Sequence, residues 1–156
     1  MSKENRELIL SVMRANGRSD ARDLRGRATG ADGSAPMDGT AIIAEEHKIP
    51  MWSAEKDYSG WSAGAPVRYN GQVYVLLQPH NAAHYPDSTP ENTAALWSIR
   101  HTKDPAKAKP FMSPAGTSGV YAEGECCVLN GAVYRSRKDD NPYSPAEYAD
   151  WWEAVE

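Results

Sequence analysis

The sequence predicts a mainly β protein in which two small tandem three-stranded antiparallel domains with aromatic cores follow a short N-terminal amphipathic helix and a flexible linker. Three observations lead to this prediction. The 156 residues include five Trp and eight Tyr but one Phe, long aliphatic runs are missing, and the chain repeats itself at a spacing of 60 residues. Large rings can supply the burial that a small domain needs when aliphatic layers are absent.

The N-terminal segment, residues 1–16, is predicted to form an amphipathic helix for assembly or anchoring. Gly17 stands where a C-cap would, and a helix this short is marginal in water by itself. Its apolar side packs either on its own domain or on a partner, and the sequence leaves both open. The apolar positions at helical spacing are Leu8, Ile9, Val12 and Met13.

Residues 17–50 are predicted to be a linker rich in Gly, Arg and Asp, with a second short helix near 40–48. Asp38 or Thr40 can cap that helix, and Pro50 stops it. The arginines are interleaved with aspartates, which indicates a solvated segment and not a nucleic-acid site.

The repeat divides the remainder into residues 51–101 and 111–156, joined by a short stiff linker at 102–110. Asn70-Gly71 and Asn130-Gly131 each stand between alternating runs, and Asn-Gly there is the strongest local signal for a β-hairpin. A hairpin alone is unstable, so aromatic rings must close each core.

The shift of 60 residues lays Trp61 on Tyr121, and a five-residue contraction lays Trp97 on Trp152. Rings at such repeated positions are predicted to be structural. The predicted aromatic core is Trp52, Trp61, Tyr74, Trp97, Tyr121, Tyr134 and Trp152.

Four rings without a repeated counterpart are the candidates for a binding surface. Tyr85, Tyr143 and Tyr148 lie in Pro-rich loops, and Trp151 neighbours the core-like Trp152 and should point outward. Exposed rings mark binding sites but also cover loops, and both interpretations stand.

The sequence gives little evidence for a metal site, an enzyme active site, or binding to nucleic acid or membranes. His80 and His84 could be drawn as metal ligands with Asp87, but prolines interrupt the helix this would need, so no metal and no cofactor are predicted. There is no nucleophile elbow, phosphate loop or paired carboxylate, so no enzyme is predicted. The net charge of −4 and the lack of apolar runs argue against nucleic-acid binding and membrane insertion.

The cysteines, Cys126 and Cys127, are adjacent, so their side chains should point to opposite faces of a strand and remain free thiols. Free thiols suit a protein made in a reducing cytoplasm, and the N-terminus does not read as a signal peptide.

Residues 64–74, which read Gly-Ala-Pro-Val-Arg-Tyr-Asn-Gly-Gln-Val-Tyr, resemble the signature of the small chitin- and cellulose-binding modules of carbohydrate-binding families 5 and 12. Residues 124–134 match it less closely. The resemblance implies a scaffold for sugar binding. In those modules exposed aromatics after the second hairpin strand form the platform, whereas this chain has Leu-Leu-Gln-Pro at 76–79 and Ser-Arg-Lys-Asp at 136–139.

The whole arrangement also resembles small phage and prophage tail-region proteins, through phrases such as Asp-Gly-Thr-Ala-Ile-Ile-Ala-Glu-Glu at 38–46 and Gly-Glu-Cys-Cys at 124–127. This implies a non-catalytic virion protein, made in the bacterial cytoplasm, that contacts other virion proteins and binds host cell-wall or capsular polysaccharide. A homotrimer through the N-terminal helix is expected. The alternatives are a purely structural decoration or fibre protein and a secreted chitin-binding accessory protein.

Overall fold

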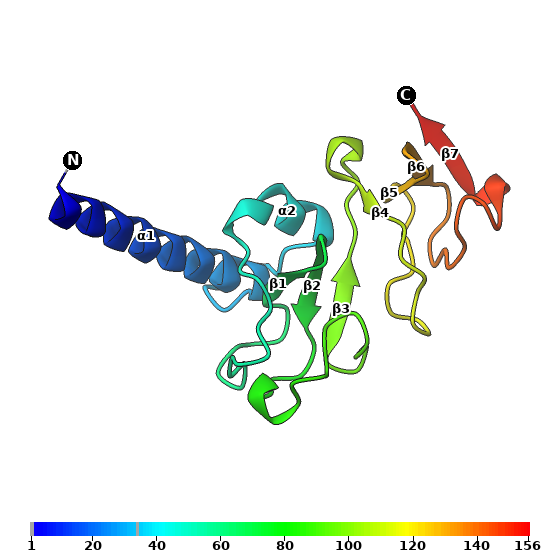
Figure 1. The fold of residues 1–156 in the computed structure, drawn as a ribbon. Helices are drawn as coiled ribbons and strands as arrows, with labels where there is room; N and C mark the ends of the chain where they lie inside the picture. Colours follow the sequence, from blue (N-terminus) through cyan, green and yellow to red (C-terminus); the bar gives the residue numbers. More distant parts are fainter. Residues whose placement is uncertain (1, 34) are drawn as a thin grey trace.

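The computed structural model describes residues 2–33 and 35–156; residue 1 of the predicted N-terminal segment and residue 34 of the predicted linker lie outside them. The chain begins with α1 (Lys3–Thr29), which projects from the body with the N-terminus at its far end (Figure 1). The Ser2 hydroxyl oxygen caps α1 by accepting from the backbone N–H of Asn5, and Gly30, at φ +76°, ends it in the left-handed conformation.

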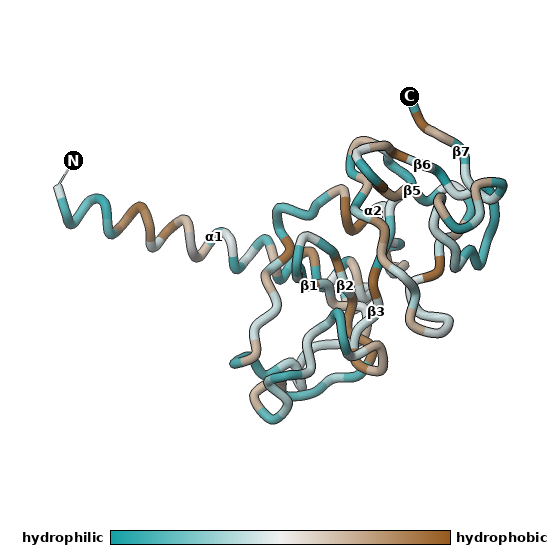
Figure 2. Tube along the Cα trace, turned by 45° about the vertical axis from the view of Figure 1, so that its right-hand side comes forward, coloured by the Kyte–Doolittle hydropathy of each residue, from teal (hydrophilic) through white to brown (hydrophobic). Residues whose placement is uncertain are grey.

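The prediction that a flexible linker begins at residue 17 is wrong for the part that α1 occupies. Ala21, Leu24 and Ala28 recur at helical spacing and are buried against the body. This burial outweighs the cost of Gly17 inside a helix, about 1 kcal/mol. The sequence therefore carries two apolar stripes in one helix: the first is exposed and the second is docked (Figure 2).

The predicted second helix is present as α2 (Gly39–Ala44) followed by a 3₁₀ turn, η1 (Glu46–Lys48). The Asp38 carboxylate caps α2 by accepting from the backbone N–H of Ala41. Glu45 then accepts from Arg27 of α1, which fixes the two helices to each other, and this contact lowers the pKa of Glu45 to about 2.

The first sheet contains β1 (Pro66–Tyr69), β2 (Gln72–Leu76) and β3 (Trp97–Arg100) in the antiparallel order β1-β2-β3. Two further 3₁₀ turns, η2 (Ala82–His84) and η3 (Pro105–Lys107), lie before and after β3. The predicted three-stranded arrangement is thus present in the first unit, residues 51–101.

The second sheet has four strands where the sequence predicts three. They are β4 (Lys109–Pro110), β5 (Cys126–Leu129), β6 (Ala132–Ser136) and β7 (Trp152–Val155), in the order β4-β5-β6-β7, with a 3₁₀ turn, η4 (Ala149–Trp151), before β7. The added strand β4 runs parallel to β5 and belongs to the segment predicted as linker. With a helix of 27 residues and strands of at most five, the fold is mixed α and β, not mainly β.

Both predicted hairpins are confirmed. Asn70 and Gly71 have φ of 48° and 75°, and Asn130 and Gly131 have φ of 53° and 79°. Positive φ at both central residues is the requirement of a type I′ turn, and Asn-Gly meets it at low cost.

Three clusters form the core. An aliphatic cluster joins α1 and α2 to Val73 and Val75 of β2. Aromatic clusters fill the two sheet units, around Tyr58 and Trp97 in the first and around Tyr121 and Trp152 in the second. The two faces of β2 therefore pack against different parts of the core, since Tyr74 and Leu76 belong to the aromatic core of the first unit.

The two units are joined by direct contacts. The ring of His101, just after β3, stacks on Tyr121 of the second unit at 3.7 Å between centroids, and its Nε2 pairs with the carbonyl oxygen of Gly119 at 2.8 Å. The amide of Gln72 donates to the carbonyl of Pro110, and Lys109 pairs with Glu46. The linker predicted at 102–110 thus packs between the units.

Both cysteines are buried free thiols, as the sequence predicts. Burial raises the pKa of the Cys127 thiol to about 12. None of the helices among the described residues has the length and hydropathy to cross a membrane.

Candidate functional site

The loop between β6 and β7 is held by one buried asparagine. Asn141 is fully buried, its side-chain amide donates to the Ser136 hydroxyl oxygen at 2.9 Å, and its carbonyl oxygen accepts from the backbone N–H of Tyr143 at 3.0 Å. The indole N–H of Trp152 donates to the carbonyl of Tyr143, also at 3.0 Å. The backbone of Tyr143 is therefore tied to the core while its side chain faces outward.

A second set of bonds shapes the next turn of the same loop. The backbone N–H of Ser144 donates to the Glu147 carboxylate, and the Ser144 hydroxyl oxygen accepts from the backbone N–H of Glu147. This reciprocal pairing has the pattern of a capping box. The backbone N–H of Tyr148 also donates to the carbonyl of Ser144, and the backbone N–H of Trp151 donates to the carbonyl of Tyr148. These bonds set the spacing between the Tyr148 and Trp151 rings.

Three of the four candidate rings meet on this loop. Tyr143 and Tyr148 stack at 5.3 Å between centroids with an interplanar angle of 28°. Trp151 stands edge-on to both, at 5.3 Å from Tyr143 and 5.7 Å from Tyr148. Tyr143 and Tyr148 are 39% and 47% exposed, and Trp151 is half-buried. We call these three residues the aromatic cluster.

The cluster is bordered by charge. The Lys138 ammonium lies 5.6 Å from the Trp151 ring centroid, a cation–π contact that helps fix the ring. The loop also carries carboxylates at Asp139, Asp140 and Asp150, all exposed. Apolar ring faces with polar groups around them are the arrangement that a sugar ring needs, since its C–H faces pack on rings and its hydroxyls form hydrogen bonds.

The fourth candidate, Tyr85, lies apart from the cluster in sequence and in ring contacts. It is 55% exposed in the loop between β2 and β3 of the first unit, and its ring neighbour among the described residues is His84, at 6.5 Å. That loop and the loop of the cluster join corresponding strands, so all four candidates occupy equivalent loops of the two units.

The seven rings predicted to be structural all belong to the two aromatic core clusters. Tyr74, Trp97, Tyr121 and Trp152 are buried, and the other three are half-buried at the cluster edges. Four of these rings come from the first unit, whose exposed aromatic ring is Tyr85.

One alignment is corrected by the hydrogen bonds. Tyr58, and not Trp61, corresponds to Tyr121: each is fully buried, each lies edge-on to the returning Trp at 5.1 Å, and each hydroxyl oxygen accepts a backbone N–H. Trp61 is an additional ring that packs against α1, with the Arg25 guanidinium 4.5 Å from its centroid. The 60-residue shift does not align these two tyrosines, because they are three residues further apart in the sequence than the corresponding strands of the two units.

The histidines show no metal site. The Nδ1 atom of His80 lies 2.8 Å from the Gln78 carbonyl oxygen, and His84 lies beside Tyr85. In the part of the chain that the structure describes, no three His, Cys, Asp or Glu side chains gather as a metal ion would require.

Comparison with known proteins gives one family. No curated protein matches the chain. One family model matches the first unit, up to the second residue of β3, and the match does not extend to the unit that carries the aromatic cluster. The matching residues are 51–98, the model is that of carbohydrate-binding module family 5/12, and the match supports carbohydrate binding.

Proposed function

We propose that this protein is a non-catalytic component of a phage or prophage virion, in the tail or baseplate, that binds a host cell-surface polysaccharide. The aromatic cluster of the second unit is the main contact surface in this proposal, and Tyr85 of the first unit is a lesser one. The observation that carries it is the convergence of Tyr143, Tyr148 and Trp151 on one loop of the second unit. The hairpin of that unit has the same register as the hairpin of the first unit, which matches the carbohydrate-binding module family.

The geometry favours a ridge over a flat platform. The two tyrosine rings are nearly parallel and Trp151 is perpendicular to both, so the outer face of a tyrosine is what a pyranose ring can stack on. Exposed clustered rings of this kind are uncommon on a surface with no partner. A short stretch of a polysaccharide chain is the ligand that such a ridge fits.

Affinity electrophoresis of the full chain tests this proposal. Native gels containing glycol chitin, hydroxyethyl cellulose or solubilised bacterial capsule retard a binding protein. We expect Tyr148→Ala to weaken the retarding interaction about two- to tenfold, since an aromatic contact contributes about 0.5–1.5 kcal/mol and 1.4 kcal/mol is tenfold. Tyr85→Ala, also an exposed loop ring, should have a smaller effect. Equal mobility of wild type and Tyr148→Ala in every gel would contradict the cluster assignment.

The exposed half of α1 is the proposed assembly element. Leu8 and Met13 are 64% and 62% exposed, and Ile9, Leu10 and Val12 are exposed too. A helical segment of this length holds poorly in water without a partner. We expect a homotrimer, measured by light scattering coupled to size exclusion. Leu8→Glu with Val12→Glu should give monomers, with Glu7→Gln on the same helix as control; a monomeric wild type would contradict the proposal.

The virion assignment has its own test. Mass spectrometry of purified tail particles should detect the protein, and tail or baseplate genes should lie beside its gene. Presence in particles without binding to any polysaccharide would favour a structural decoration or fibre protein. A neighbouring chitinase gene, with absence from particles, would favour a secreted chitin-binding accessory protein.

A further inference from the structure

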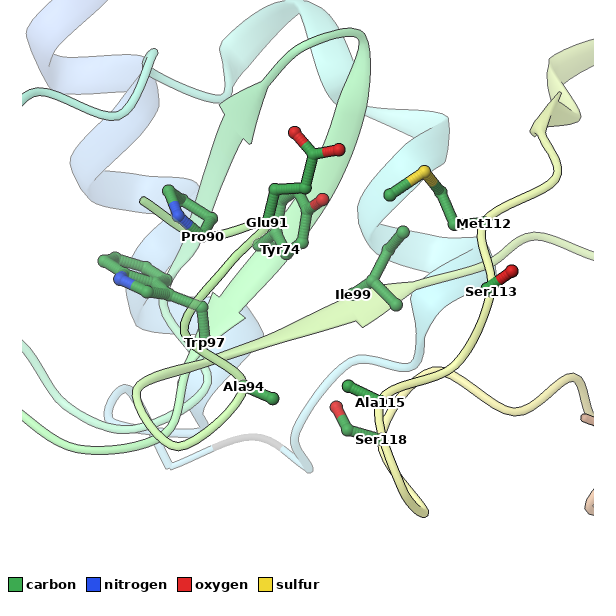
Figure 3. A pocket seen from close by; sticks show the side chains of 10 residues that line it. All are labelled: Tyr74, Pro90, Glu91, Ala94, Trp97, Ile99, Met112, Ser113, Ala115 and Ser118. Carbon is green, nitrogen blue, oxygen red and sulfur yellow. The ribbon is translucent and has the colours of Figure 1, made fainter. Parts of the chain in front are cut away.

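The cavity between the two units (Figure 3) belongs to the packing of the protein and is not a ligand site. Its volume is about 40 Å³, and Tyr74 and Trp97, which line it, are 3% and 1% exposed. Two larger cavities lie along α1. One of about 420 Å³ lies between the middle of α1 and the segment that leads into β1, and one of about 260 Å³ lies between the end of α1 and residues 60–65. Ligand pockets range from roughly 300 to 1,000 Å³, so the first is within this range and the second is close to it.

The larger cavity, which we call the α1 groove, is kept open by a glycine. Gly17 and Ala21 of α1 form one wall, and Ile49, Pro50 and Arg68 form the other. A Cβ added at Gly17 would meet no atom within 4 Å. Glycine is unfavourable inside a helix. At this position it leaves space, because a larger side chain would extend into the groove.

Arginines line both cavities. Arg18 lines the α1 groove, and Arg22 and Arg25 line the smaller cavity. Their spacing of four and three residues places them on one flank of α1, over about 10 Å at 1.5 Å per residue. Arg68 of β1 adds a fourth charge, and its Nε donates to the carbonyl of Ile49 at 2.7 Å, which holds the guanidinium at the groove. We call these four arginines the arginine track.

The arginine track is not neutralised by the protein. On the opposite flank of α1, Arg27 forms ion pairs with Asp23 and Glu45. No ion pair between described residues includes an arginine of the track. Among the described residues that line the two cavities, the carboxylate is that of Asp20, which is exposed. The track therefore carries an excess of positive charge.

Arg25 shows this excess most clearly. Its guanidinium carbon lies 4.5 Å from the centroid of the Trp61 ring, and the Lys56 ammonium lies 5.2 Å from the same centroid. Burial and the charge of Arg22 both lower the pKa of Arg25. The ring contact holds the guanidinium but does not use its N–H groups, and these donate no hydrogen bond in the part of the chain that the structure describes. A bound anion would accept from them and offset the repulsion between the two arginines.

We propose that the arginine track binds an acidic polysaccharide, one that carries carboxylate or phosphate groups at intervals along its chain. One anionic group accepts from Arg22 and Arg25 at the smaller cavity. The next accepts from Arg18 and Arg68, with its sugar ring in the α1 groove. The inference rests on the proposed function and adds the charge of the polysaccharide. Single-stranded nucleic acid would need rings on which bases stack, and Trp61 is already in contact with Arg25.

Calorimetric titration of the full chain tests this inference with four short ligands: oligoguluronate, oligo(glycerol phosphate), a neutral cello-oligosaccharide and a DNA oligomer. We expect binding of the first or the second, which distinguishes carboxylate from phosphate. Arg18→Gln with Arg22→Gln should weaken that binding about two- to thirtyfold, because each contact between exposed charges accounts for up to about fivefold. Both side chains are exposed and unpaired within the described residues, so thermal unfolding should be unchanged.

Two controls separate the track from a general effect of charge. Arg6→Gln with Lys107→Gln removes the same charge at exposed sites on α1 and η3, and binding should remain as in the wild type. Gly17→Leu fills the α1 groove and should weaken binding at least threefold without lowering the unfolding temperature, because leucine favours a helix more than glycine does. Gly17→Ala adds one methyl group in open space and should bind like the wild type.

Tyr148→Ala should leave binding of the acidic oligomers intact, so a failure of the aromatic cluster and a failure of the arginine track appear in different variants. Three results would overturn the inference, whatever the gels with neutral polymers show. The wild type binds neither acidic oligomer, the Arg18→Gln, Arg22→Gln variant binds as tightly as the Arg6→Gln, Lys107→Gln control, or the DNA oligomer binds more tightly than both acidic saccharides.

Discussion

The two sheet units share one backbone frame but differ in what they present on it. The backbone N–H of Gly64 donates to the backbone carbonyl of Leu76 at 2.7 Å, and the backbone N–H of Gly124 donates to the backbone carbonyl of Ser136 at 2.8 Å. The β1–β2 and β5–β6 pairings have the same register after a shift of 60 residues. A frame this regular depends on few positions: the Asn-Gly turn, a buried tyrosine and a returning tryptophan.

The loops between the second and third hairpin strands differ. In the first unit the loop is residues 77–96 and its asparagine, Asn81, is followed by two alanines. In the second unit the loop is 137–151, and Asn141 is followed by Pro142 and Tyr143. The family match and the aromatic surface therefore lie on different units. The frame is maintained by core rings, while the loop side chains are free to change.

The largest difference between the units should appear at the two loop asparagines. Asn141→Ala removes a fully buried side-chain amide and leaves the Tyr143 N–H without its acceptor, while the Ser136 hydroxyl keeps its bonds to Lys138. We expect the free energy of unfolding to fall by about 2–3 kcal/mol, since unpaired buried groups cost about 1–3 kcal/mol. Asn81→Ala removes one side-chain bond, to Ala83, at a half-buried site and should cost about 1 kcal/mol or less. If urea unfolding shows the same loss of unfolding free energy in both variants, the proposed difference between the two loops is wrong.

The junction between the units should respond to pH. Burial lowers the pKa of His101 to about 4 from its ordinary value of 6.5. Between these values the unfolded chain binds a proton that the folded protein does not, so the free energy of unfolding falls as pH falls from 6.5 to 4, by up to about 3 kcal/mol. The stability that His101 contributes is complete above pH 6.5.

His101→Phe serves as the control for this pH dependence. It keeps a ring to stack on Tyr121 but cannot titrate, so the slope between pH 6.5 and 4 should flatten even if the variant is less stable overall. Glu125, whose pKa is raised by burial, contributes with the opposite sign in both proteins and cancels in the comparison. Parallel stability curves for the two proteins would contradict the role of His101.

The smallest difference should appear at the returning tryptophans. Trp152→Phe removes an indole N–H that donates to Tyr143, whereas the indole N–H of Trp97 has no partner among the described residues. Trp152→Phe should therefore cost about 1 kcal/mol more than Trp97→Phe, after the similar loss of packing. It should also weaken polysaccharide retardation, because Tyr143 loses its anchor. A larger loss for Trp97→Phe in denaturant unfolding would reverse this ranking.

The sequence predicts those elements whose signals are local. The Asn-Gly turns require positive φ at two adjacent residues, which is a property of the dipeptide itself. The length of α1 is not local, because Ala21 and Leu24 become a helix face only when the body is there to bury them. Strand β4 was missed for the same reason: Lys109 and Pro110 have no strand pattern of their own and pair because η3 directs them along β5.

The sequence names four candidate rings but does not predict how they lie relative to one another. The absence of a repeated counterpart singled out Tyr143, Tyr148 and Trp151, yet their mutual angles depend on the Asn141 and Ser144 bonds, which no spacing rule gives.

The projecting half of α1 bears on how strongly the protein can hold a surface. Residues 3–16 extend about 20 Å at 1.5 Å per residue, and the sheet units lie beyond its docked end (Figure 1). Copies joined by these arms would present several aromatic clusters at once. After the first contact, each further contact is intramolecular, so the avidity for a dense glycan layer can exceed the single-site affinity by about 10²- to 10⁴-fold. A weak cluster is then sufficient, and reversible single contacts let the assembly move across the surface before it settles.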